Sequence, residues 1–315
     1  MRWTYLLPLF CGLLFLSSCL PKQSTTDDMP AIKLGAMSSM DYIPYVVAMK
    51  HGIYDSLGVQ VELVKFFSAN DRDAAFQAGM IDGTIIDYTG AILQQANGIP
   101  LRLIMKNDGF FYLIANKDKH IRRPDDLRGK SLSVSRNTVI EYTTDFLLQT
   151  AGLTEDEVEK PEINKIPLRL EMLQNGQIDA CVLPDPFATI ARANGHPALT
   201  TTREAGISVT GTMFTEQALR NKRKAVEKIV QGYNLGVSYI RTHPLSDWSD
   251  ILVQDAGVPA ALVEQLTLPD YEAATFPSEK DLQETVTWLR RKGLIPANYD
   301  TRHLLDTIHG VRFSQ

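Results

Sequence analysis

The stretch that decides the fold is Gln77–Pro100, QAGMIDGTIIDYTGAILQQANGIP, because it recurs 97 residues later as Gln174–Pro197, QNGQIDACVLPDPFATIARANGHP. Nine of the 24 aligned positions are identical, whereas chance would give about one or two. Either the chain holds two related α/β units, or the same turn chemistry arose twice. Both alternatives place one local structure in two parts of the chain.

The repeated stretch predicts a helix end, a buried strand and a second helix. Glycine supplies the left-handed conformation that ends a helix, and a short apolar run suits a parallel strand buried on both faces. The first copy has a helix end at Gly79, strand Gly83–Ile86 and a second helix that stops at Asn97-Gly98; the second copy has Gly176, Ala180–Leu183 and Asn194-Gly195, with Pro186 in the first helical turn.

The alternation of strands and helices continues outside the repeat. Such alternation predicts parallel α/β sheets joined by right-handed crossovers. After about residue 215 only helices are expected, and these should pack back on the first unit. The expected strands are Ile32–Ala36, Val59–Phe66, Leu101–Met105, Phe111–Ala115, Ser131–Val134 and Glu162–Ile166, and the expected helices are Pro44–His51, Asp71–Ala78, Thr138–Ala151, Leu168–Asn175, Lys222–His243 and Ser278–Lys292.

The composition and the N-terminus predict an exported protein. A formal net charge of −5 without a basic block argues against nucleic-acid binding, which depends on neutralising phosphates. Arg2, the apolar run Leu6–Leu16 and Ser17-Ser18-Cys19 are typical of an export signal. Leu16–Cys19 resembles the bacterial lipoprotein cleavage box, so residues 1–18 would be a signal peptide, Cys19 the lipidated residue and 19–30 a tether. The alternative is an ordinary signal cut elsewhere, with an incidental cysteine.

Four motifs carry a family resemblance that covers roughly residues 31–220. They are Ile43-Pro44-Tyr45 with Ala48–Tyr54, Ala78–Asp82, Asp125–Leu132 and Leu173–Ala180. With them the chain resembles the periplasmic solute-binding proteins of ABC importers that take up sulfonates, taurine, nitrate or thiamine-precursor pyrimidines. The motifs are specific for the family and nearly silent about the solute.

The resemblance implies a type II periplasmic-binding-protein fold, in which two α/β lobes enclose a ligand cleft. The first lobe would comprise residues 31–112 plus 208–315, and the second residues 113–207. Two crossovers would act as the hinge, and closure would trap the solute. The implied partners are a small solute, an ABC permease with its ATPase, and the membrane through the anchor at Cys19. We expect a monomer, facing the periplasm or cell exterior from the cell membrane or the outer membrane.

The ends of the strands predict which residues line the cleft, because open α/β sheets bind ligands beyond the carboxyl ends of their strands. Several candidates have a simpler explanation: Ser68, Asn70 and Thr138 lie where helices begin, and Tyr42 suits packing between helix and sheet. The full set is Ser38, Ser39, Asp41, Tyr42, Phe67, Ser68, Asn70, Asp87, Tyr88, Ser135, Arg136, Asn137, Thr138, Glu141, Asp185 and Phe187. Asp82 and Asp179, at equivalent repeat positions, are interpreted as turn or cap residues.

The solute class follows from the balance of charges near these positions. Residues Ser135–Thr138 at a helix N-terminus, with Arg136, favour an anion. The carboxylates Asp41, Asp71, Asp87, Glu141 and Asp185 and the aromatic residues Tyr42, Phe67, Tyr88, Tyr142 and Phe187 favour amino groups and flat rings. The sequence therefore predicts an aminopyrimidine or a similar nitrogen heterocycle, with a sulfonate, taurine or nitrate as the alternative.

An enzyme and a lipid-anchored sensor are the competing function classes. A eukaryotic relative of this fold makes the thiamine pyrimidine with a cysteine-rich iron-binding segment. Outside the signal and anchor this chain has only Cys181, expected to be a buried core thiol. G-x-S-x-G and H-E-x-x-H motifs are absent, and His303 and His309 have no metal-ligand cluster beside them. We therefore expect no catalysis, cofactor or metal, and a neighbouring permease gene would favour transport over sensing.

Overall fold

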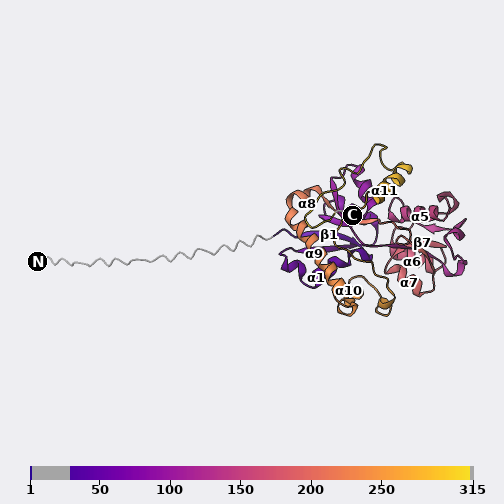
Figure 1. Ribbon diagram of the computed structural model, residues 1–315, viewed down its shortest axis with the longest axis horizontal. Helices are drawn as coiled ribbons and strands as arrows, with labels where there is room; N and C mark the ends of the chain where they lie inside the picture. Colours follow the sequence, from indigo (N-terminus) through magenta and orange to yellow (C-terminus); the bar gives the residue numbers. More distant parts are fainter. Residues whose placement is uncertain (2–28, 313–315) are drawn as a thin grey trace.

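The computed structural model describes Met1 and residues 29–312, and residues 29–312 form one body with two lobes (Figure 1). Apart from Met1, the predicted signal peptide 1–18 lies outside the described residues, and so do the predicted lipidation site Cys19 and most of the predicted tether 19–30. Within the described part of the chain, no helix is long and apolar enough to cross a bilayer.

The lobes are built on two mixed sheets. The first sheet has the order β2-β1-β3-β9-β4, and the second has the order β6-β7-β5-β8. The strands of the first are β1 (Ile32–Met37), β2 (Val61–Phe66), β3 (Gly83–Asp87), β4 (Leu101–Lys106) and β9 (Thr210–Thr215); those of the second are β5 (Phe111–Ala115), β6 (Leu132–Ser133), β7 (Ala180–Pro184) and β8 (Ala198–Thr201).

The expectation of parallel sheets is met for some strand pairs and wrong for others. Strand β1 is parallel to β2 and β3, and β6 is parallel to β7, but β9 runs antiparallel to β3 and β4. Strand β5 is likewise antiparallel to β7 and β8. The reason is the double crossover: the chain leaves the first sheet after β4 and returns as β9 from the second lobe. Strand β9 therefore starts at the edge where β3 ends, with Thr210 opposite Asp87.

Helices cover the faces of both sheets. Those of the second lobe are α5 (Val139–Thr150), α6 (Ile166–Gln174) and α7 (Phe187–Ala193). Those associated with the first lobe are α1 (Ile43–Lys50), α2 (Ile53–Ser56), α3 (Ala69–Gln77), α4 (Tyr88–Ala96), α8 (Glu216–Asn221), α9 (Arg223–Thr242), α10 (Ser249–Gln254) and α11 (Glu279–Arg291). The long C-terminal helices predicted after residue 215 are thus present as α9 and α11, and α9 packs against α1.

Two local predictions fail around prolines. The expected strand Glu162–Ile166 is absent, since Glu162 makes only an isolated bridge to Val134 and α6 begins at Ile166. Pro167, in the first turn of α6, suits a helix start and accounts for the change of structure there. Pro186 occupies the N-cap of α7, one residue before the predicted first turn.

The repeated aspartates fasten neighbouring strands. Asp82 Oδ2 accepts a hydrogen bond from the backbone N–H of Lys33 in β1 (2.9 Å). Asp179 Oδ2 accepts the equivalent bond from the N–H of Ser131, next to β6 (2.9 Å). A carboxylate bonded to a backbone N–H fixes where two strands start relative to each other. The sequence repeat therefore reflects the same structural device in both lobes.

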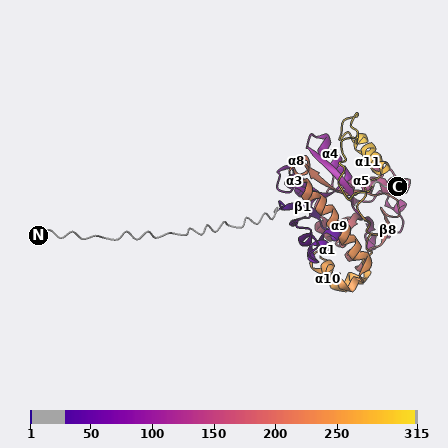
Figure 2. The same ribbon diagram turned by 60° about the vertical axis from the view of Figure 1, so that its left-hand side comes forward.

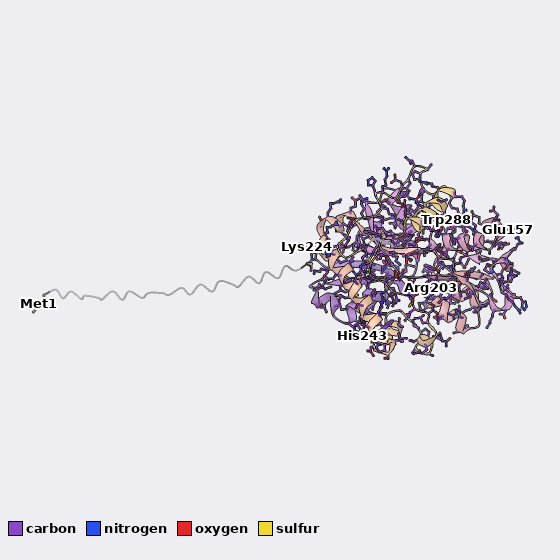
Figure 3. The ribbon with its side chains drawn as sticks, viewed as in Figure 1. Met1, Glu157, Arg203, Lys224, His243 and Trp288 are labelled. Carbon is purple, nitrogen blue, oxygen red and sulfur yellow. The ribbon has the colours of Figure 1, made fainter. Side chains whose placement is uncertain are left out.

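The two lobes are in contact through an apolar cluster in one place and through a backbone hydrogen bond in another. One apolar cluster continues across the lobes and includes Ile92 of α4, Tyr142 of α5 and Trp288 of α11. In both ribbon views α11 lies beside α5 (Figures 1 and 2), and Trp288 is labelled there in Figure 3. Elsewhere the backbone N–H of Ile166 donates to the carbonyl of Phe67 across the lobes (3.2 Å).

The cysteine of the second lobe lies in its core. Cys181 in β7 is fully buried and forms no disulfide. Burial raises the pKa of its thiol to about 12, so the group stays protonated at neutral pH. The thiol is therefore a small apolar core group, as the sequence predicts.

Candidate functional site

A cavity lies between the lobes, where β1 and β3 of the first sheet and β7 of the second end. Its volume is about 50 Å³, which is enough for several water molecules. The polar lining from the first lobe is Ser39, Asp41, Arg72, Asp87 and Thr210, and that from the second lobe is Ser135, Thr138, Asn164 and Arg169. Much of the remaining lining is aliphatic, with Phe111 as its aromatic ring.

Arg72 in the first-lobe wall is a neutralised cation. The side chain is 2% exposed, and its Nη1 and Nη2 each lie 3.3 Å from Asp87 Oδ2. Its Nε donates to Asp73 Oδ1 at 2.8 Å. Asp87 also accepts a bond from the N–H of Gly90 (2.7 Å) and so caps α4. These charges satisfy one another and hold β3, α3 and α4 together.

Asp41 is the titratable acid of the first-lobe wall. It is buried, and its carboxylate accepts a short hydrogen bond from the hydroxyl of Ser39. Burial raises the pKa of Asp41 to about 6, against the lowering effect of the bonds from Ser39 and Thr210. Near neutral pH this group can accept a hydrogen bond as a carboxylate, or donate one when protonated.

Arg169 in the second-lobe wall is a buried cation without a counter-charge. It is fully buried; Nη2 donates to the carbonyl of Ile163 (2.8 Å) and Nη1 to that of Val182 (3.3 Å). Its Nε has no acceptor, and no carboxylate within residues 29–312 pairs with it. Burial lowers the pKa of Arg169 to about 10, so the guanidinium stays charged at neutral pH.

A tight turn at the start of α5 supplies the other polar groups of this wall. Thr138 Oγ1 accepts from the N–H of Ile140 (3.2 Å) and donates to the carbonyl of Ser135 (2.8 Å). Asn137 adopts a left-handed conformation (φ 61°), and its N–H donates to Glu141 Oε2 (2.7 Å). Glu141 thus fixes the backbone of the turn that presents Ser135 and Thr138 to the cavity.

The candidate residues predicted from sequence divide into three groups. Five of them line the cavity: Ser39, Asp41, Asp87, Ser135 and Thr138. Buried outside its lining are Ser38, Tyr42, Ser68, Tyr88, Glu141 and Asp185. Among these, the hydroxyl of Tyr42 donates to the carbonyl of Asp255 (2.7 Å), and Asp185 Oδ1 accepts from the N–H of Thr189 in the first turn of α7 (2.9 Å).

The third group lies at or near the surface. Phe67, Asn70, Arg136 and Asn137 are exposed, and Phe187 is half-buried. Arg136 pairs with Glu162 (3.6 Å), outside the cavity lining.

Sequence reasoning missed Arg72, Asn164, Arg169 and Thr210 in the lining. One available signal was helical spacing: Ile166, Leu170 and Leu173 mark the buried face of α6, and Arg169 falls on that same face.

One group of carboxylates outside the cavity has the spacing of a metal site. Within the described residues, Glu141, Asp145 and Glu155 offer oxygens within 4.8 Å of one another; we call them the acidic cluster. Two lysine ammonium groups form ion pairs with these carboxylates: Lys292 Nζ lies 3.3 Å from Glu141, and Lys160 Nζ lies 3.1 Å from Glu155. Although burial opposes it, bonds from these lysines lower the pKa of Glu155 to about 2. The cluster is an ion-pair network that joins α5 to the end of α11.

Comparisons with known proteins agree with this architecture. A family model described as "NMT1/THI5 like" matches residues 39–246. A protein named as a periplasmic binding protein of an ABC transporter in Brachyspira hyodysenteriae is 21% identical over 244 residues, which cover 72% of this chain and 70% of that protein.

Solved structures share the fold. The alkanesulfonate-binding protein SsuA from Xanthomonas axonopodis pv. citri, bound to MOPS, superposes with a TM-score of 0.72 at 17% identity, covering 91% of this chain and 99% of SsuA. The desulfurization enzyme DSZB superposes with a TM-score of 0.63 at 15% identity, covering 84% and 93%. At these identities the similarity establishes only the fold, which is the two-lobed binding-protein fold that the sequence predicts. Both binding proteins and enzymes have this fold.

Proposed function

The chain belongs to the NMT1/THI5-like family, and from this premise we propose that it is the solute-binding protein of an ABC importer. The observation that supports this most directly is the cavity, whose polar walls come from both lobes. A solute can enter such a cavity only when the lobes separate, and closure then buries it. The protein would capture the solute, close on it and deliver it to a membrane permease that an ATPase drives.

The lobe limits and the anchor belong to this proposal. We propose the predicted lobe limits, 31–112 plus 208–315 and 113–207, with one change: the first boundary moves to residue 110, because β5 of the second sheet begins at Phe111. Crossovers near residues 107–110 and 202–209 would form the hinge. An exported protein anchored through lipid on Cys19 would stay close to its permease. Labelling cells with a clickable fatty acid tests the anchor: the wild-type chain should be labelled and Cys19→Ser should not.

For the solute we propose a small molecule with N–H donors, such as an aminopyrimidine or a similar nitrogen heterocycle. Asp41 supports this because its carboxylate is an acceptor in the cavity wall, whereas Asp87 is already committed to Arg72. Phe111 offers an aromatic contact for a flat ring. The alternative class of sulfonate, taurine or nitrate is supported by Arg169 on the opposite wall.

A thermal-shift screen followed by calorimetry tests the binding role. The panel is pyrimidines, thiamine, flavins, taurine, alkyl sulfonates, nitrate and bicarbonate. A ligand present at about 100 times its dissociation constant should stabilise the protein by roughly 2.7 kcal/mol. Asp41→Asn should weaken an amine-bearing solute at least tenfold, and Asp270→Asn, at a carboxylate that is 95% exposed, should not.

Recovery of the solute separates a binding protein from an enzyme. Solute released from the denatured complex should have an unchanged mass after prolonged incubation. Conversion of the solute would refute the binding role in favour of catalysis. Two negative results together would refute the importer proposal. The ligand-free protein would bind no compound of the panel, and a strain lacking the gene would take up every compound as well as the parent strain does.

A further inference from the structure

The buried guanidinium of Arg169 indicates the chemical class of the solute. Proteins rarely bury a charged side chain completely without an opposite charge, because removal from water is costly. The two cationic side chains of the cavity differ in this respect. Arg72 faces Asp73 and Asp87, whereas the acceptors of Arg169 are two backbone carbonyls.

The donors of Arg169 are only partly used. A guanidinium has five N–H groups, and the bonds to the carbonyls of Ile163 and Val182 account for two of them. The Nε–H is buried and has no acceptor in the described chain. An unsatisfied charged donor in the wall of a solute cavity is unfavourable in the empty protein, and it becomes favourable when a ligand supplies an anionic acceptor.

From this arrangement we infer that Arg169 anchors an acidic group of the solute, a carboxylate or a sulfonate. The inference rests on the proposed solute-binding function and names the class of solute. A planar guanidinium can donate two parallel hydrogen bonds to either group, which fixes orientation as well as charge.

The surroundings of Arg169 fit an anion. Ser135, Thr138 and Asn164 line the same wall, and none is a carboxylate. The hydroxyl of Ser135 donates to Asn164 Oδ1 and that of Thr138 to the carbonyl of Ser135 (both 2.8 Å), so the Nδ2 group of Asn164, bonded once to Glu162 (3.1 Å), is the side-chain donor that remains beside Arg169. Helix α5, twelve residues long, begins at this wall with Val139 and Ile140 in the cavity lining, so its positive dipole end lies there too. The carboxylate of the first turn, Glu141, is outside the lining and bonded to Asn137 and Lys292.

The opposite wall sets the second requirement. Asp41 would repel a second acidic group but would accept a bond from an amine or an amide N–H. The cavity therefore favours a small solute with an acidic group toward Arg169 and an N–H donor toward Asp41. An aminopyrimidine that carries a carboxylate satisfies both walls, and so does taurine. Nitrate lacks the donor, and a plain aminopyrimidine lacks the acid.

The first experiment tests the anion site without knowledge of the solute. Sodium acetate and sodium methanesulfonate, in which each acid group carries a single methyl group, are compared with sodium chloride at equal ionic strength. One or both should raise the melting temperature of the wild-type protein above that in chloride. Arg169→Met should abolish the difference, and Arg220→Met, at a 67% exposed arginine, should retain it. Equal responses of wild type and Arg169→Met would overturn the inference.

The second experiment uses matched pairs of probes in calorimetry. The pairs are 4-aminopyrimidine-5-carboxylate with 4-aminopyrimidine, and taurine with ethanolamine. In at least one pair the wild-type protein should bind the acidic member about 100-fold tighter. Arg169→Met should remove that preference, and Arg169→Lys should retain part of it. Arg169→Met should still bind the acid-free member as the wild type does. Loss of that binding as well would show that the variant has failed to fold.

The outcomes separate the solute class from the importer role. If 4-aminopyrimidine or another neutral solute binds tightly and equally to wild type and Arg169→Met, the solute-binding function stands and the acidic anchor is refuted. If acetate or methanesulfonate protects only the wild type while transport in the deletion strain is unchanged, the anion site stands and the importer role is refuted.

Discussion

Asp41→Asn should stabilise the solute-free protein at pH 8 by about 3 kcal/mol. Burial raises the pKa of Asp41 from 3.8 to about 6, a difference of roughly 2 units at about 1.36 kcal/mol each. Because the native pKa lies above the unfolded one, the ionised carboxylate costs stability at high pH. That cost declines as the pH falls through 6 and disappears below 3.8. Asparagine keeps the shape and the acceptor for Ser39 but carries no charge.

Urea unfolding of the two proteins at several pH values measures this difference directly. The advantage of Asp41→Asn should shrink from about 3 kcal/mol at pH 8 to about 1 kcal/mol at pH 4.5, and should vanish near pH 3.5. The exposed-site variant Asp270→Asn should show no comparable trend. A variant no more stable than wild type at pH 8, or an advantage that does not change with pH, would refute the assignment of Asp41 as a strained buried acid.

Three further changes test the contacts that hold the lobes. Lys292→Met should cost roughly 1–3 kcal/mol in urea unfolding near neutral pH, because the acidic cluster keeps only part of its counter-charge. Since bonds from the lysines lower the pKa of Glu155 from 4.5 to about 2, a loss that does not diminish as the pH falls from 4.5 to 2 would contradict this. Trp288→Phe keeps the apolar ring but loses the Nε1 bond to Asp145 (2.9 Å), so unfolding should become easier by about 1.5–3 kcal/mol, whereas unchanged stability would argue against that bond. Asp179→Ala should speed amide exchange at Ser131, and unaltered exchange there would refute the strand-fastening role.

The sequence predicted the elements whose patterns are local. The repeat gave β3 and β7 with their flanking helices, since glycine ends and short apolar runs are encoded within a few residues. Strand direction is not encoded in that way. Strand β9 is antiparallel because the chain re-enters the first lobe from the second, and no feature of residues 210–215 reports where the chain has been.

The candidate site was predictable only in part, for a similar reason. Ser39, Asp41, Ser135 and Thr138 follow strands directly, so the rule about strand ends found them. Arg169 lies inside a helix, where an arginine normally reaches solvent. The proposed role of Arg169 depends on the absence of a carboxylate beside its guanidinium. That absence cannot be predicted from sequence, because the fold decides which side chains surround Arg169.

Because the thiol of Cys181 is buried, residues 29–312 of the folded protein should react only slowly with maleimides. Within residues 29–312 it is the sole cysteine, and a protonated core thiol reacts slowly. In a variant that begins after Cys19, a cysteine introduced at Leu168, which is 45% exposed beside Phe67 on the other lobe, would therefore take a fluorophore selectively. The label would report each opening and closing as a change in brightness. The same fold can thus serve as a reagentless sensor for its own solute.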